Sequence, residues 1–68
     1  MTITYHKTSD LLYICLDPDA RQVVNKDISD DIVLDLGEND RIVGIEILDA
    51  SKRVDLARVL SVQYAEVA

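Results

Sequence analysis

The stretch Arg41-Ile-Val-Gly-Ile-Glu-Ile-Leu-Asp-Ala-Ser51 decides how this chain folds, because β-branched residues crowd its first half. Such side chains are favoured on the pleated surface of a strand. Successive side chains point to opposite faces, so Val43, Ile45 and Ile47 share an apolar face while Glu46 lies on the other. This pattern is typical of a central strand in an antiparallel sheet that is covered on one side. We therefore expect a strand here, at the centre of the sheet.

The segment just before that strand repeats the alternation. Ile32, Leu34 and Leu36 fall on one face, and Asp35 falls on the other. The intervening residues 37–40 read Gly-Glu-Asn-Asp, and glycine and asparagine tolerate the positive φ angles of tight connections. The sequence therefore predicts a β-hairpin that joins the two strands.

A second hairpin is expected at the N-terminus. Thr2–Tyr5 alternates between threonine and larger side chains, Lys7–Asp10 is polar and turn-forming, and Leu11–Leu16 alternates again. Asp17-Pro18 ends this second strand, because proline cannot donate to a strand ladder. We expect Gln22–Ile28 to add an edge strand that runs antiparallel to the second strand.

The periodicity changes after the central strand. Apolar residues now include the three- and four-residue spacings of one helical face, at Val54, Leu56, Ala57, Val59 and Leu60. Asp49 or Ser51 can cap such a helix by accepting hydrogen bonds from its free N–H groups. We expect a helix to about Leu60 that packs on one face of the sheet. Residues 61–68 fit either an extension of the helix or a returning strand.

The chain of 68 residues is long enough for one small domain, residues 1–68, of the α+β class. It would hold a small antiparallel sheet of two hairpins, the extra edge strand and the C-terminal helix. A domain this short buries only about 60% of the surface of its unfolded chain. The single cysteine, Cys15, forms no intrachain disulfide, and with one histidine, His6, it cannot complete a closed zinc site. We therefore expect self-association, most simply as a homodimer.

The charge is −6, and the acids concentrate between Asp27 and Asp49. Negative charge opposes phosphate backbones and anionic lipid, so we expect neither nucleic acid nor a membrane as partner. A small basic protein is compatible, although solubility alone also accounts for an acidic surface. The chain lacks a secretory leader and an apolar run of about 20 residues, so we expect a cytoplasmic protein.

Three segments, Tyr5–Ile14, Ile32–Asp35 and Asp40–Ser51, resemble the small prokaryotic family called domain of unknown function 2283 (DUF2283). The resemblance covers about residues 3 to 53 and is most specific in Val-Gly-Ile-Glu-Ile-Leu-Asp-Ala-Ser. The chain departs from the family at Asn39-Asp40, where Asp-Gly is usual, and at Leu11, where alanine is usual. The resemblance implies a small antiparallel sheet with a C-terminal helical segment. It implies no activity and no catalytic residue, and the genomic setting of some members, similar to toxin–antitoxin pairs, suggests partner binding.

The residues that carry chemistry do not form a reactive constellation. Cys15 and His6 could form a nucleophilic pair, but a lone cysteine flanked by Ile14 and Leu16 is more typical of a small hydrophobe. Pairs of acids in the predicted turns lack the spacing of a calcium-binding loop. The chain has two glycines, too few for a glycine-rich phosphate loop. We therefore expect that the protein is not an enzyme and that it binds neither a cofactor nor a metal ion.

Glu46 is unusual as an acid in the middle of the central strand. It either faces water on the open face of the sheet, or it forms a polar patch there with Asp35 and Tyr13. Such a patch would pair with arginine or lysine of a partner or a second copy. Lys52 and Arg53 of the predicted helix would complement the helix dipole or the acidic sheet of a neighbour. These five residues form the predicted interaction surface.

These observations favour a non-enzymatic protein-interaction module that self-associates. One form of this hypothesis is an antitoxin-like partner of a small basic toxin. The alternative is a protein that binds a small molecule or a metal on the open sheet face.

Overall fold

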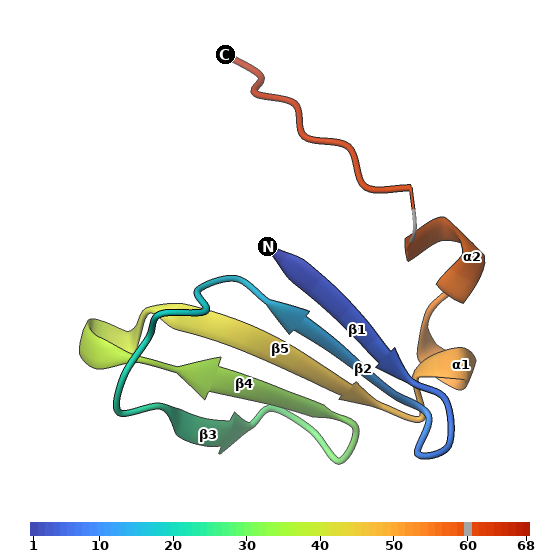
Figure 1. The fold of residues 1–68 in the computed structure, drawn as a ribbon, viewed down its shortest axis with the longest axis horizontal. Helices are drawn as coiled ribbons and strands as arrows, with labels where there is room; N and C mark the ends of the chain where they lie inside the picture. The colour runs from blue at the N-terminus through green and yellow to red at the C-terminus, as the bar shows by residue number, and fades with distance from the viewer. Residues whose placement is uncertain (60) are drawn as a thin grey trace.

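The computed structural model describes residues 1–59 and 61–68, and its centre is a five-stranded antiparallel sheet (Figure 1). The strands are β1 (Thr2–His6), β2 (Leu11–Cys15), β3 (Val24–Asp27), β4 (Ile32–Leu36) and β5 (Ile42–Leu48). They are ordered β1-β2-β5-β4-β3, so β5 is central and pairs with both β2 and β4. The strand expected as the centre of the sheet is confirmed.

The register places the expected apolar residues on one face. Ile45 of β5 lies between Ile14 of β2 and Leu34 of β4, and Ile47 lies between Leu12 and Ile32 in the same way. Because side chains alternate along each strand, these residues line a common face. A register shift follows in β4, where Leu36 pairs with Ile42 instead of with Val43. We call the face of Ile45 and Ile47 the apolar face.

The edge strand β3 pairs with β4, not with β2 as its sequence suggested. A short turn joins β3 to β4, in which the backbone N–H of Ile28 donates to the carbonyl of Ile32 at 2.8 Å. Closing this short loop costs less conformational entropy than a pairing across the longer crossing segment. All four residues of β3 are exposed, so no apolar pattern in the sequence pointed to the partner strand.

The connection between β4 and β5 contains a short 3₁₀ turn, η1 (Glu38–Asp40). Asn39 and Asp40 take the positive φ angles of this turn, both 58°. Gly37 has φ −98°, so its role is not the positive φ that its residue type suggested. Instead, a Cβ at Gly37 would lie 2.9 Å from Cγ2 of Val43. Glycine therefore fits here because it has no side chain that would crowd Val43.

The single C-terminal helix of the prediction is divided into two short helices, α1 (Ala50–Arg53) and α2 (Leu56–Val59). Val54 between them is extended, with φ −134° and ψ 154°. Asp55 starts α2, since its side chain accepts a hydrogen bond from the N–H of Ala57 at 3.1 Å. The expected end of the helix, Leu60, lies outside the described residues. Residues 61–68 contain neither helix nor strand and run away from the sheet (Figure 1).

The side chain of Asp10 connects α1 to the β1–β2 turn. One of its carboxylate oxygens accepts the N–H of Ser51 at 3.0 Å, and the other accepts the Ser51 hydroxyl at 2.6 Å. The hydroxyl of Tyr5 donates to the same carboxylate at 2.7 Å. Asp49, one of the two predicted caps, makes no side-chain capping bond, and the hydroxyl of Ser51, the other, donates to Asp10. A residue far away in the sequence therefore caps α1.

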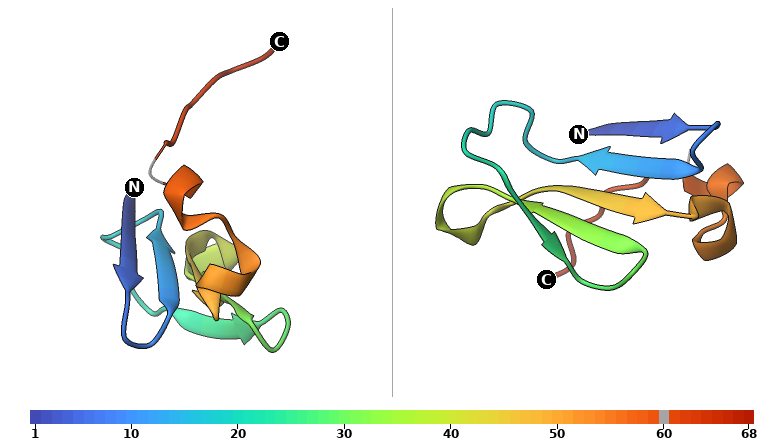
Figure 2. Two further views of the ribbon diagram at one scale, coloured as in Figure 1. Left: turned by 90° about the vertical axis from the view of Figure 1, so that its right-hand side faces the viewer. Right: turned by 90° about the horizontal axis from the view of Figure 1, so that it is seen from below.

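Both helices lie at the end of the sheet where β5 ends (Figure 2). There α2 faces β1 and β2 across a cleft of about 340 Å³, which we call the apolar cleft. It is lined by Ile3, Tyr5, Leu12, Leu56, Ala57 and Val59. Over the rest of the apolar face, residues such as Ile45 and Leu34 remain only half-buried. Among residues 1–59 and 61–68, no helix has the length and apolar character needed to cross a membrane.

Candidate functional site

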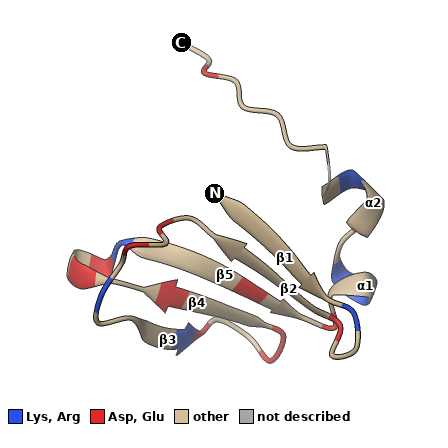
Figure 3. Cartoon of the chain, in the orientation of Figure 1, with Lys and Arg blue, Asp and Glu red and all other residues tan. Residues whose placement is uncertain are grey.

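Three neighbouring strands bring Tyr13, Asp35 and Glu46 together on the face opposite to the apolar one. Tyr13 of β2 is paired directly with Glu46 of β5, and Asp35 of β4 is paired with Gly44, two residues before Glu46. Figure 3 shows acidic residues on β4 and β5 and in the turns, and basic residues on α1 and α2. We call Tyr13, Asp35 and Glu46 the three-residue site.

Gly44 allows this arrangement because it has no side chain. A Cβ at this position would lie 2.5 Å from the hydroxyl oxygen of Tyr13 and 2.8 Å from Cε1 of its ring. The phenol therefore lies directly over the backbone of β5, on the side of the sheet that also carries Asp35. Although no described helix lines this face, Asp35 is only 7% exposed.

The buried side chain of Asp35 has one carboxylate oxygen that forms no hydrogen bond with the described residues. Oδ1 is inaccessible to solvent and has no hydrogen-bond partner among the described residues. An ionised Glu46 cannot satisfy it, because two carboxylates only accept hydrogen bonds. Hydrogen bonding to Asp35, together with burial, raises the pKa of Glu46 above its ordinary value. The Asp35 carboxylate beside Glu46 thus favours the protonated form of Glu46.

Tyr13 stays protonated over the whole physiological range. Burial, followed by the Asp35 carboxylate beside it, raises the pKa of the Tyr13 phenol to about 12. The site thus combines two carboxyl groups with a neutral phenol, and it has no activated nucleophile. Within the part of the chain that the structure describes, no group of three His, Cys, Asp or Glu side chains is placed to hold a metal ion. The arrangement is suited to accept positive charge or hydrogen-bond donors.

The structure does not bring Cys15 and His6 together. Cys15 is paired with Thr2 at one end of the β1–β2 hairpin, and His6 is paired with Leu11 at the other end. The two positions are four residue steps apart along the strand, which is about 13 Å. A Cys15–His6 nucleophilic pair therefore has no geometric support.

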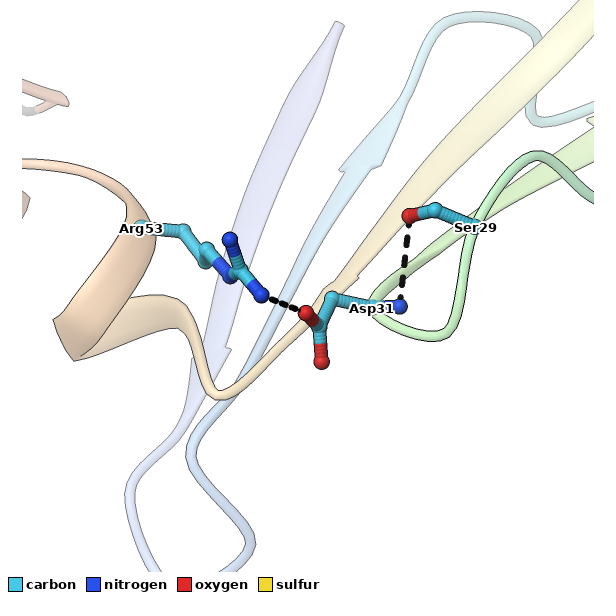
Figure 4. Close-up of polar contacts among 3 residues, drawn as sticks. All are labelled: Ser29, Asp31 and Arg53. Carbon is cyan, nitrogen blue, oxygen red and sulfur yellow. Dashed lines mark hydrogen bonds and ion pairs between the residues drawn. The ribbon is translucent and has the colours of Figure 1, made fainter.

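Lys52 and Arg53 lie on α1 and not at the three-residue site. The Arg53 guanidinium instead pairs with Asp31 in the turn between β3 and β4 (Figure 4). The N–H of Asp31 donates in turn to the hydroxyl of Ser29 at 3.3 Å. Arg53 therefore links α1 to the far half of the sheet, which is a structural role that the sequence pattern did not reveal.

A second hollow of about 530 Å³ lies at the opposite end of the sheet, between the segment after β2 and the η1 turn. Its lining mixes acids with bases: Asp17, Asp19, Ala20, Arg21, Gln22, Gly37, Glu38, Arg41 and Val43. Because charges of both signs surround an open space, this hollow favours no single class of ligand.

Comparison with known proteins gives a family and one partial relative. The family model described as "Protein of unknown function (DUF2283)" matches residues 2–51. A protein of Methanosarcina mazei named "Putative hypoxanthine phosphoribosyltransferase" is 51% identical over 39 residues, which is 54% of this chain and 32% of the relative. The chain thus spans about a third of the length of that relative. No solved structure matches the chain significantly.

Proposed function

The chain belongs to the DUF2283 family of proteins of unknown function, and from this premise we propose that it is a protein-interaction module that self-associates as a homodimer. In this proposal it acts without catalysis, in the cytoplasm. A phosphoribosyltransferase activity is not part of it, because the likeness to the relative of that name covers 39 residues.

The observation that carries this proposal is the large surface of the chain. It exposes 5629 Å² at a mass of 7.6 kDa, whereas a folded monomer of this mass exposes about 4300 Å². Part of the excess comes from the extended residues 61–68. The whole difference, which includes the surface of these residues, exceeds the roughly 800 Å² that each partner buries in a standard interface.

The distribution of apolar residues supports the same proposal. Among the described residues, the buried apolar side chains are those of Leu12, Val43 and Ala50. Tyr5, which lines the apolar cleft, is 38% exposed and Ile42 is 49% exposed, although both belong to strands. A core this small stabilises a domain poorly, and a second copy would remove further apolar surface from water. We place the contact between copies at the apolar cleft, where α2 and the β1–β2 hairpin meet.

The three-residue site then remains free for a different partner. Its acidic character, within a chain of charge −6, favours a basic protein, and an antitoxin-like role toward a small basic toxin is the specific form of this proposal. Lys52 on α1 would serve the contact between copies, while Arg53 is engaged with Asp31.

The competing proposal is binding of a small molecule. The hollow of about 530 Å³ near η1 has the volume for one, although its mixed charges give it no evident selectivity. A thermal-shift screen with metabolites and divalent metals tests this alternative. A saturable rise in Tm that Arg41→Gln removes would favour it over self-association.

Self-association is tested by light scattering on the eluting peak of a size-exclusion column, over a range of protein concentrations. We expect twice the 7.6 kDa of one chain, and we expect Leu56→Glu in the apolar cleft to yield the single-chain mass. Val24→Glu is the matched control, since it places the same charge on an exposed apolar residue of the far edge strand. A single-chain mass for the unmodified protein at every concentration would contradict the proposal.

A further inference from the structure

We infer that the three-residue site takes one guanidinium group, the side chain of an arginine presented by a basic protein partner. The inference rests on the proposed interaction function and names the chemistry that the site recognises. It follows from the placement of Tyr13, Asp35 and Glu46 on one uncovered face and from the unpartnered oxygen of Asp35.

The strongest reason is the Oδ1 atom of Asp35. A buried polar atom without a hydrogen bond costs free energy, and native structures leave few such atoms. Asp35 is 93% buried, yet it lies beside Gly44 of the central strand, on the face of the sheet opposite to the apolar face. A ligand that donates a hydrogen bond to Oδ1 removes this cost, so the free site favours ligands that donate hydrogen bonds.

The spacing of the acceptors favours a guanidinium over other cations. Asp35 and Glu46 project from neighbouring strands as diagonal neighbours, about 7–8 Å apart, which is within the reach of their side chains. A planar guanidinium carries five N–H donors in a fixed fork and can bond to two carboxylates at once, whereas an ammonium ion is a compact point charge. The Tyr13 ring offers, in addition, an aromatic surface beside the carboxylates, to which arginine is attracted.

A guanidinium beside Asp35 and Glu46 favours the ionised form of Glu46, because a positive charge stabilises a carboxylate. Where Glu46 is protonated, its proton passes to solvent, and both carboxylates then accept hydrogen bonds from the arginine. Binding is therefore coupled to proton release, and affinity rises with pH as Glu46 ionises. The titratable side chains on this face of the sheet are His6 of β1, Tyr13 and Cys15 of β2, Asp27 of β3, Asp35 of β4 and Glu46 of β5.

The test is a titration of the full chain with three short peptides, acetyl-Gly-Arg-Gly-amide and its lysine and glutamine counterparts, followed by NMR. We expect the arginine peptide to shift the amide signals of Tyr13, Gly44 and Glu46 saturably at millimolar concentration. The lysine peptide should bind several-fold more weakly, and the glutamine peptide should cause no saturable shift. The affinity for the arginine peptide should increase as the pH rises and Glu46 ionises, in the direction set by the raised pKa of Glu46.

Two variants show whether the effect belongs to this site. Glu46→Gln should weaken binding of the arginine peptide by roughly tenfold, because it removes one charged acceptor. Asp27→Asn removes an exposed acid from the same face at β3 and should leave the affinity unchanged. Equal responses to the arginine and glutamine peptides, or an unchanged affinity in Glu46→Gln, would overturn the inference.

The outcomes also separate this inference from the proposed self-association. If the protein has the mass of a dimer but does not bind the peptide, the arginine site is rejected and the proposed self-association stands. If the protein binds the peptide but has the mass of a single chain, self-association is rejected and the arginine site stands. A response to magnesium or calcium equal to that of the arginine peptide would show a general cation site and would contradict the assignment to arginine.

Discussion

Asp10 holds both the backbone N–H and the hydroxyl of Ser51, at 3.0 and 2.6 Å, although the two residues are 41 positions apart. The carbonyl of Asp10 also accepts the N–H of Ala50 at 3.0 Å. The turn after β1 thus supplies three acceptors to the start of α1. Because α1 has only four residues, it is too short to be stable alone, and this contact fixes its position at the end of β5.

Removing the Ser51 hydroxyl tests this contact. We expect Ser51→Ala to lower Tm by about 5 °C, since one hydrogen bond to a carboxylate is lost at a helix start. The same change should raise the pKa of Asp10 toward its ordinary value, because the Ser51 side-chain bond is the largest cause of its depression. Thermal unfolding and an NMR pH titration measure the two effects. Ser9→Ala, in the same turn, is the control, and an equal loss in both variants would contradict the role of Ser51.

Because the pKa of Asp10 is depressed in the folded chain, the stability of the fold depends on pH in the acid range. A carboxyl group whose pKa is lower in the folded state contributes stability above the unfolded pKa, near 3.9, and loses it as the pH falls through the folded value. We expect Asp10→Asn to remove this part of the slope when the free energy of unfolding is measured in urea between pH 5 and pH 2.5. An unchanged slope would show that other carboxyl groups dominate the acid transition.

The alternation of apolar residues was sufficient to predict most of the sheet. It identified the hairpins β1–β2 and β4–β5, because large apolar side chains recur at every second position of these strands. It failed for β3, whose residues are all exposed and whose partner is set by a short turn. It also missed the break at Val54, since the helical spacing continues across this residue while the backbone becomes extended.

The placement of Tyr13, Asp35 and Glu46 on one face could be predicted, but the burial of Asp35 could not. Alternation along each strand, together with the pairing of β2, β4 and β5, puts the three residues on one face. The burial of Asp35 depends on a contact that no sequence pattern encodes, namely the position of the Tyr13 ring over Gly44. Lys52 and Arg53 could not be separated from the site by sequence, because the pairing of Arg53 with Asp31 depends on where α1 follows β5.

Glu46→Gln should stabilise the free protein at neutral pH. The amide donates to Asp35 without needing a proton, so it satisfies Oδ1 at every pH. In the unmodified chain the pKa of Glu46 is shifted upward, whereas that of Asp10 is shifted downward. The contribution of Glu46 to stability is therefore full below its unfolded pKa and is lost as the pH rises through its folded pKa. We expect Tm of the variant to exceed that of the unmodified chain at pH 8 and to converge with it near pH 4. A lower Tm at pH 8 would show that the introduced amide does not satisfy Oδ1 of Asp35.

The contact between Tyr13 and Gly44 yields a double-mutant test of the site. Gly44→Ala places a Cβ within 2.8 Å of Cε1 of Tyr13, which forces the ring away and should cost about 1–3 kcal/mol. In the background of Tyr13→Ala the same alanine meets no ring, so its cost should fall to a few tenths of a kcal/mol or change sign. Urea unfolding of the four proteins of the cycle measures the coupling. Additive costs would mean that the ring does not lie on Gly44 in solution, and the burial of Asp35 would then lose its explanation.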